Sequence, residues 1–254
     1  MRLAAWNVNS LKVRLPQLLD WLAAQQPDVV CLQETKAEDH NFPQQALAVA
    51  GYHVVFCGQK TYNGVALLSR ETATEVVCAN PHIVCEQKRL IAATINGVRV
   101  ISAYIPNGQS VGSEKYAYKL AWLAALETWL AEQLAIYPKL AIAGDFNIAP
   151  EDRDVHNPAA WEGQVLCSEP ERAAFRLLLA LGLQDSFRLF AQPEKTFSWW
   201  DYRMLGFQKN QGLRIDHILL SPALAQRCSA SRIDREMRKR ERPSDHAPVF
   251  ADID

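Results

Sequence analysis

The 254-residue sequence lacks the features that mark membrane, secreted and repeat proteins. It contains no run of about 18 apolar residues, so no segment is long enough to form a transmembrane helix, and we expect no membrane contact. The opening stretch MRLAAWNVNS has no apolar segment, so we expect no signal peptide. No Gly/Ser-rich linker, low-complexity tract or internal repeat divides the chain, which predicts one domain over residues 1–254.

None of the six cysteines is spaced as CxxC, and Cys31 lies inside the apolar run DVVCLQE. A chain of this length buries enough apolar surface to fold without disulfides. We therefore expect all six cysteines to be reduced, in a cytoplasmic protein. The net charge is −1, so the chain as a whole has no attraction for nucleic acid, although the segment RIDREMRKRER (232–242) is locally basic.

Strands are predicted more often than helices. The turn residues Asn96 and Gly97 separate two β-branched runs and predict a tight hairpin. Apolar residues at helical spacing predict helices over residues 14–25 and 114–136, and a capping box of Ser168 and Glu171 begins a third, which ends at Gly182. The predicted strands are RLAAW, DVVCLQ, HVVFCG, GVALLS, RLIAATI, VRVISAYI, KLAIAG, RIDHILL and APVFADI. Helices dispersed among hairpins and strands favour an α/β fold with two packed sheets and helices outside.

Several of the apolar runs end in, or begin after, a carboxylate, carboxamide or imidazole. Two of these groups, Asp245 and His246, lie in the turn RPSDHAPV, whose two prolines restrict the backbone and so aim its side chains. Strand ends at one edge of a sandwich can converge on one pocket, although any one such acid alone is more often a turn residue. These residues are Asn7, Glu34, Asp145, Asn147, Asp216, Asp245 and His246.

Oxygen ligands from carboxylates and carboxamides suit a hard divalent cation. A set with no cysteine and one histidine indicates Mg²⁺, or Mn²⁺, rather than zinc. Converging acids also repel a phosphate, so a cation is needed before a phosphodiester can approach. The residues therefore favour metal-assisted phosphoester hydrolysis.

The motifs WNVN, LQE, YIPNG, GDFN, RIDHIL and SDHAPV occur in an order that resembles the exonuclease III branch of the endonuclease/exonuclease/phosphatase superfamily. The resemblance extends from Leu3 to Val249. KTYNGVALLSR (60–70), FSWWDYR (197–203) and the ending ERPSDHAPV are similar to the DNA-repair members. The resemblance implies a DNase I-like, four-layered sandwich of two mixed β-sheets flanked by helices.

The resemblance implies that Glu34 is the principal metal ligand, with Asn7 beside it. Asp145 and Asn147 would orient or deprotonate the attacking water and hold the phosphate. If GDFN is extended, these two side chains emerge on the same face. Asp245 would help to hold a metal. The candidate metal ligands are thus Asn7, Glu34, Asp145, Asn147, Asp245 and His246.

Asp216 would pair with His246 and raise the pKa of its imidazole, so that the charged ring can donate a hydrogen bond to a phosphate oxygen. Tyr104 of YIPNG would place a phenol near the same phosphate. The candidate catalytic residues are Tyr104, Asp145, Asn147, Asp216 and His246.

The DNA-binding candidates are polar, basic or aromatic residues beside these motifs. Trp199 would line the pocket for a sugar or abasic residue, and the others would contact the backbone, which sets affinity but reads no sequence. The segment 155–172 would border this pocket, and its shape decides between internal incision and trimming of 3′ ends. The candidates are Asn9, Lys60, Tyr62, Asn63, Asn107, Trp199, Arg203 and Arg214, with Lys209 as a further phosphate contact.

The resemblance therefore implies a Mg²⁺-dependent DNA-repair nuclease that hydrolyses phosphodiesters 5′ to abasic sites, at 3′ ends, or both. The expected partner is double-stranded DNA with an abasic site, a nick or a 3′ end, and the expected state is a monomer. Two alternatives stay open: a phosphatase or phosphodiesterase acting on a non-DNA phosphoester, and a DNA-end binding module without catalysis.

Overall fold

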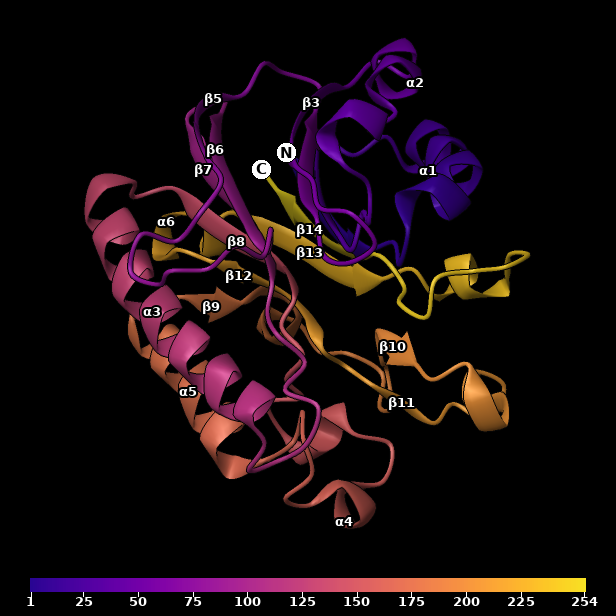
Figure 1. Cartoon of the computed structure of the whole chain (residues 1–254), viewed down its shortest axis with the longest axis vertical. Helices are drawn as coiled ribbons and strands as arrows, with labels where there is room; N and C mark the ends of the chain where they lie inside the picture. The colour runs from indigo at the N-terminus through magenta and orange to yellow at the C-terminus, as the bar shows by residue number, and fades with distance from the viewer.

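Two mixed sheets form the centre of the computed structural model, which describes residues 1–254 (Figure 1). The first is a 6-stranded sheet whose order is β13 (Cys228–Ile233), β14 (Val249–Ile253), β1 (Arg2–Asn7), β2 (Val29–Gln33), β4 (Val65–Ser69) and β3 (His53–Cys57). The second, also 6-stranded, has the order β5 (Thr74–Val77), β6 (Leu90–Ile95), β7 (Val98–Tyr104), β8 (Leu140–Asp145), β12 (Asp216–Leu220) and β9 (Gln184–Asp185). A small separate ribbon pairs β10 (Trp199–Trp200) with β11 (Gly212–Leu213).

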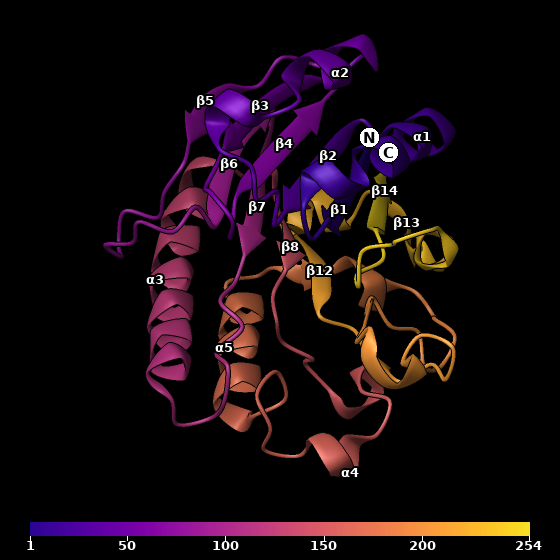
Figure 2. The same cartoon turned by 45° about the vertical axis from the view of Figure 1, so that its right-hand side comes forward.

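Helices cover the outer faces of both sheets, so the molecule has four layers (Figures 1 and 2). On the first sheet lie α1 (Leu11–Gln25) and α2 (Gln44–Val49); on the second lie α3 (Glu114–Ile136) and α5 (Glu169–Ala180). The short helices α4 (Pro158–Trp161) and α6 (Pro222–Ala225) lie in connections. This arrangement confirms the predicted four-layered sandwich.

Successive side chains along each strand point to opposite faces of the sheet, so each strand contributes to two apolar layers. In β1, Leu3 and Ala5 join the apolar cluster between the sheets, whereas Ala4 and Trp6 join the cluster under α1. A third cluster packs α3 and α5 against the second sheet. Each central strand is therefore apolar on both faces, as sheets covered on both sides require.

The parallel pairs in each sheet determine where polar groups can meet. β1 runs parallel to β2, and β7 runs parallel to β8, so the paired strands end at the same edges. The antiparallel neighbour β12 begins where β8 ends, with Asp216 opposite Asp145. Strand ends from both sheets therefore face one region of the molecule.

The predicted helices are present. α3 covers residues 114–136, and α5 begins after Ser168 with both bonds of the predicted capping box to Glu171. α1 begins at Leu11 rather than at residue 14, and it continues through Pro16. Asn96 and Gly97 both adopt positive φ in the predicted hairpin between β6 and β7.

The cysteines do not all match the prediction. A disulfide joins Cys57 at the end of β3 to Cys78 after β5, with their Cα atoms 6.1 Å apart. The expectation of six reduced cysteines is therefore wrong, because the two strands bring residues distant in sequence to bonding distance. The cysteines no longer support a reducing compartment.

No helix is both long and apolar enough to cross a bilayer.

Gly144, immediately before Asp145, makes a testable contribution to this fold. Its φ is 147°, and a Cβ there would lie 2.0 Å from the Ala103 carbonyl oxygen. We expect Gly144→Ala to lower the free energy of unfolding, measured in urea, by about 3 kcal/mol. Gly97→Ala is the control, since φ is also positive but no atom lies within 4 Å, and it should cost about 1 kcal/mol. Equal losses in both variants would contradict this account.

Candidate active site

Three strand ends from the two sheets meet at a carboxamide. The Asn7 Nδ2 atom donates to Glu34 Oε1 and to Asp145 Oδ2, both at 2.9 Å. Asn7 ends β1, Glu34 follows β2, and Asp145 ends β8. Glu34 has a φ of 49°, an uncommon conformation for a residue with a side chain, which turns the chain at this edge. The predicted convergence of Asn7, Glu34 and Asp145 is therefore present.

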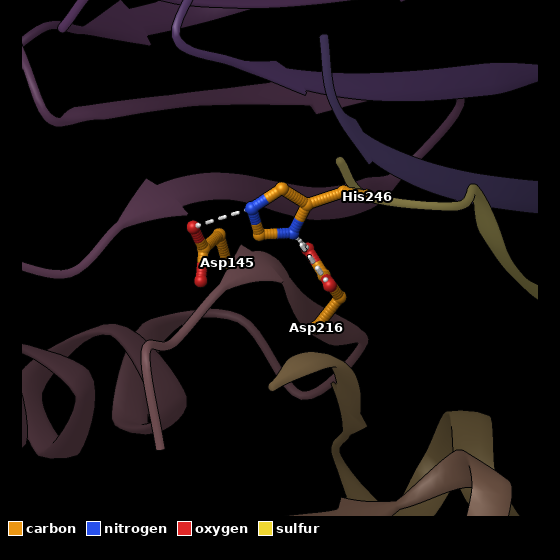
Figure 3. Close-up of side chains that lie close together, drawn as sticks. All are labelled: Asp145, Asp216 and His246. Atoms are coloured by element: carbon orange, nitrogen blue, oxygen red, sulfur yellow. Dashed lines mark hydrogen bonds and ion pairs between the residues drawn. The ribbon is translucent and has the colours of Figure 1, made fainter. Parts of the chain in front are cut away.

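His246 lies between two carboxylates from neighbouring strands (Figure 3). Its Nδ1 atom is 2.9 Å from Asp216 Oδ2, and its Nε2 atom is 3.7 Å from Asp145 Oδ2. The turn that carries His246 is held against β1. The Trp6 indole donates to the His246 carbonyl at 3.1 Å, and the Ser244 hydroxyl donates to the Asn7 carbonyl at 2.6 Å. The predicted pair of Asp216 and His246 is thus present, on a constrained turn.

Burial and neighbouring charges together determine the protonation of His246 and Asp145. Burial by itself would lower the pKa of His246, but Asp216 and Asp145 raise it to about 10. The imidazole is therefore charged at neutral pH. Burial raises the pKa of Asp145, and the nearby Asp216 and Glu34 charges act in the same direction.

Glu34 stays ionised by a different balance. Burial would raise its pKa, but the hydrogen bond from Asn7 and the Lys36 ammonium, 2.9 Å from Oε2, lower it below the ordinary value. Lys36 also donates to Asn9 Oδ1 at 2.6 Å. Lys36 is not among the residues predicted from the sequence, although it follows the predicted ligand Glu34 by two positions.

Tyr104, the last residue of β7, lines a surface cleft together with Glu34. Burial, followed by the Glu34 and Asp145 charges, raises the pKa of the phenol well above its usual value. The Arg89 guanidinium stacks over the ring at 4.6 Å from its centroid. The phenol keeps its proton at neutral pH and can donate a hydrogen bond.

Asn147 does not follow the prediction of an extended GDFN segment. The chain turns after Asp145: Asn147 has a φ of 51°, and its backbone N–H donates to Asp145 Oδ1 at 2.9 Å. The expectation from strand alternation is therefore wrong at this position, because the aspartate side chain stabilises a turn. The Asn147 carboxamide instead accepts from Asn107 Nδ2 at 3.0 Å and donates to the Ile105 carbonyl. The two carboxamides lie together.

Asp245 is held by two donors. Asn9 Nδ2 donates to one of its oxygens at 2.9 Å, and the Trp199 indole N–H donates to the other at 3.0 Å. The close acidic cluster consists of Asp145, Asp216 and His246, whose ligand atoms lie within 4.8 Å of one another, and Asp245 is outside it. Asp245 therefore connects the two DNA-binding candidates Asn9 and Trp199 to the His246 turn.

A cleft of about 630 Å³ adjoins these groups. It reaches from Glu34 and Tyr104 outward and includes three of the DNA-binding candidates. Arg89 and Lys115 add positive charge to its wall. The sequence analysis identified neither as a site residue, although Arg89 is the first residue of the predicted strand RLIAATI. Its lining comprises Glu34, Gln59, Tyr62, Asn63, Gln87, Arg89, Tyr104, Pro106, Asn107, Gly108, Gln109, Lys115 and Tyr118.

One DNA-binding candidate is buried inside the protein. Arg214 is 1% exposed, its Nε donates to Asp154 Oδ1 at 2.6 Å, and its Nη1 lies 2.8 Å from Asp185 Oδ2. The expected contact of Arg214 with a DNA phosphate is therefore wrong, because two internal carboxylates require this charge. Lys60, Arg203 and Lys209 are exposed but do not line the cleft. Trp199 is half-buried, whereas its neighbour Trp200 is buried, as strand alternation predicts.

The pairing of His246 makes a testable prediction. The Asp216→Asn variant should lower the pKa of the imidazole from about 10 toward neutrality, because an uncharged amide replaces the carboxylate at 2.9 Å. Titration of the ring resonances by NMR in metal-free buffer measures this change. Asp252→Asn, the same substitution beside Arg2, should leave the midpoint unchanged. An unaltered midpoint in Asp216→Asn would show that the pair does not control the charge.

Comparison with known proteins agrees with the geometry. The Endonuclease/Exonuclease/phosphatase family profile matches residues 4–246. Exodeoxyribonuclease III of Haemophilus influenzae is 39% identical, with 100% of both chains covered. The 3′-5′ exonuclease NExo of Neisseria meningitidis has a TM-score of 0.98, is 47% identical and covers 100% of both chains. An AP endonuclease from Archaeoglobus fulgidus has a TM-score of 0.96 at 39% identity, covering 100% of this chain and 99% of that one. This chain therefore belongs to the exonuclease III branch of the endonuclease/exonuclease/phosphatase family.

Proposed function

We propose that this protein is a metal-dependent nuclease that hydrolyses phosphodiester bonds of double-stranded DNA at 3′ ends and 5′ to abasic sites. The observation that carries the proposal is the convergence of Glu34, Asp145 and the Asp216–His246 pair beside an open, polar cleft. Two acids, a charged imidazole and a protonated phenol are the groups that phosphoester hydrolysis requires.

A divalent cation fits the residues present. The ligand atoms of Asp145, Asp216 and His246 lie close together, and Asn7 bridges Asp145 to Glu34. The carboxylates of Glu34, Asp145 and Asp216 supply oxygen ligands, which favours Mg²⁺, with Mn²⁺ as a substitute. We propose Glu34 and Asp145 as the principal ligands, because Asn7 Nδ2 donates to both carboxylates and so places them next to each other. When bound, the cation would neutralise phosphate charge and polarise the bond to be broken.

The protein's own groups then have distinct tasks. Asp145 accepts a proton from the attacking water or orients it, and the water attacks phosphorus. The His246 imidazolium, held by Asp216, donates a hydrogen bond to a phosphate oxygen and stabilises the charge that develops there. Tyr104 donates from its protonated phenol to the same group. The P–O3′ bond breaks and leaves a 3′-hydroxyl.

Processing of 3′ ends is the activity that the comparisons favour first. A Neisseria structure described as a 3′ phosphatase bound to a product DNA hairpin is 47% identical and has a TM-score of 0.98. The AP endonuclease from Archaeoglobus fulgidus is 39% identical. Processing of 3′ ends and incision at abasic sites both break a P–O3′ bond. They differ in whether an abasic residue within a duplex can enter the pocket beside Trp199.

The direct test compares labelled duplexes on a gel in the presence of Mg²⁺. One duplex carries a recessed 3′ end, one a 3′-phosphate, and one an internal tetrahydrofuran abasic site. We expect shortening or dephosphorylation of the 3′ ends at the higher rate and incision at tetrahydrofuran at the lower. Release of phosphate from inositol phosphates with no change in any duplex would overturn the DNA assignment.

Asp145 is expected to be essential for turnover. Asp145→Asn should lower the hydrolysis rate by about 1000-fold, because the water loses its base, while DNA binding is retained. Single-turnover assays and fluorescence anisotropy separate the two quantities. Asp152→Asn, an exposed change on the next loop, is the matched control and should keep normal turnover. Normal turnover in Asp145→Asn would remove this residue from the chemistry.

Glu34 is expected to set the metal requirement. Glu34→Ala should raise the Mg²⁺ concentration for half-maximal activity by about 10-fold or more, because the site loses an anionic ligand. Glu71→Ala changes an exposed glutamate that follows β4 at the other end of the sheet, and it should not alter the titration. Superimposable Mg²⁺ curves for Glu34→Ala and the wild type would contradict the assignment.

A further inference from the structure

A lysine is completely buried behind the candidate active site. Lys119, on α3, is 0% exposed, and its ammonium pairs with the equally buried carboxylate of Glu171 on α5. A buried charge pair usually stabilises a fold no more than well-packed apolar residues would. Its presence at this place therefore calls for an explanation other than stability.

The Lys119 ammonium also holds the backbone of two turns, one carrying Asn107 and the other carrying Asn147. Its Nζ atom donates to the Asn147 carbonyl at 2.7 Å and to the Asn107 carbonyl at 3.2 Å. Those two residues meet through their side chains, with Asn107 Nδ2 donating to Asn147 Oδ1 at 3.0 Å. One cation therefore fixes the backbone on both sides of a contact that faces the cleft.

Glu171 extends this hold to a third segment. Its carboxylate accepts from the Leu166 N–H at 3.0 Å and from the Ser168 N–H at 3.1 Å. The Leu166 carbonyl in turn accepts from the Ala149 N–H at 2.8 Å, two residues after Asn147. The chain that follows Asp145 is thus held at Asn147 and at Ala149 by groups attached to the Lys119–Glu171 pair.

Packing leaves this lysine little freedom. Gly108 has a φ of +93°, and a Cβ at that position would lie 3.1 Å from Lys119 Cδ and 3.3 Å from Val165 Cγ2. The side-chain stem is therefore enclosed between the YIPNG turn and the segment before α5. The ammonium donates to three acceptors, the Asn107 and Asn147 carbonyls and the Glu171 carboxylate.

We propose that Lys119 is a positioning residue that sets the separation of the Asn107 and Asn147 turns, and through them the placement of Asp145 relative to the phosphate. This inference rests on the proposed function. Lys119 touches no substrate, so it acts on the geometry of the transition state. DNA affinity should depend instead on the exposed groups along the cleft.

The test is the Lys119→Met variant, which keeps the length of the side chain and removes the charge. We expect kcat on a 3′-end substrate to fall by about 100-fold, because a misplacement of about 1 Å at a reacting group has that effect. The KM for DNA should stay within about 2-fold of the wild-type value. Steady-state kinetics with Mg²⁺ in excess measure both parameters.

Arg99→Met is the matched control. Arg99 is also a buried cation under α3, 2% exposed, and it donates to Gln133 Oε1 at 3.0 Å and to the Glu75 carbonyl at 2.7 Å. It lies opposite Leu140, at the end of β7 and β8 remote from Tyr104 and Asp145. Arg99→Met should lower the thermal midpoint and leave kcat unchanged.

The double variant Lys119→Met with Glu171→Gln separates positioning from stability. Removing both charges leaves no uncompensated buried carboxylate, and the glutamine keeps an oxygen for the capping N–H groups of α5. We expect its thermal midpoint to recover toward the wild-type value while kcat remains low.

Three results would overturn the proposal. The first two are wild-type kcat in Lys119→Met and recovery of kcat together with the midpoint in the double variant. Loss of kcat in Arg99→Met equal to that in Lys119→Met would do the same, because any buried cation would then have the effect. A wild-type protein inactive on every duplex would instead refute the proposed function.

Discussion

Mutual repulsion among buried carboxylates is the constraint on which the rest of the site depends. Glu34, Asp145 and Asp216 end or begin strands at one region of the sandwich, where water cannot screen them fully. The fold compensates with donors placed around them: the Asn7 carboxamide and the His246 ring. These donors satisfy part of the negative charge, and the remainder is the charge that the proposed divalent cation would neutralise. Architecture and chemistry therefore share one cause, because the same parallel strands that bury the apolar core also bring the acids together.

Strands with apolar residues on both faces were predictable from the sequence, whereas of the four edge strands only β3, predicted as HVVFCG, was found. The central runs, such as VVCLQ and LAIAGD, are continuous apolar segments bounded by turn residues, and each forms a strand. The edge strands β5 and β13 escaped prediction, since TEVV and CSASRI are mostly polar and are exposed on one or both faces. Their pairing depends on a neighbouring strand rather than on their own composition.

At the site, residues marked by a local sequence motif were predictable, whereas contacts between residues distant in the chain were not. Motif positions identified Glu34, Asp145 and His246, because each lies at a strand end or in a restricted turn. Arg214 was misplaced, since no sequence pattern reveals that it is paired inside the protein with two carboxylates. Partners far apart in the chain were invisible for the same reason, including the disulfide and the buried lysine beneath the cleft.

The positions of the chain ends in the first sheet have a consequence for biosynthesis. β1 is paired between β14 and β2 (Figure 2). The Ser244 hydroxyl reaches the Asn7 carbonyl across a sequence separation of 237 residues. At the usual rate of translation this interval lasts roughly 10 to 50 seconds. During that time a growing chain has Asn7 and Glu34 but lacks the histidine turn and the strand that supports it. A nascent chain on the ribosome therefore has no complete catalytic centre, and hydrolytic capacity arises only when the last strand has been synthesised and inserted beside the first.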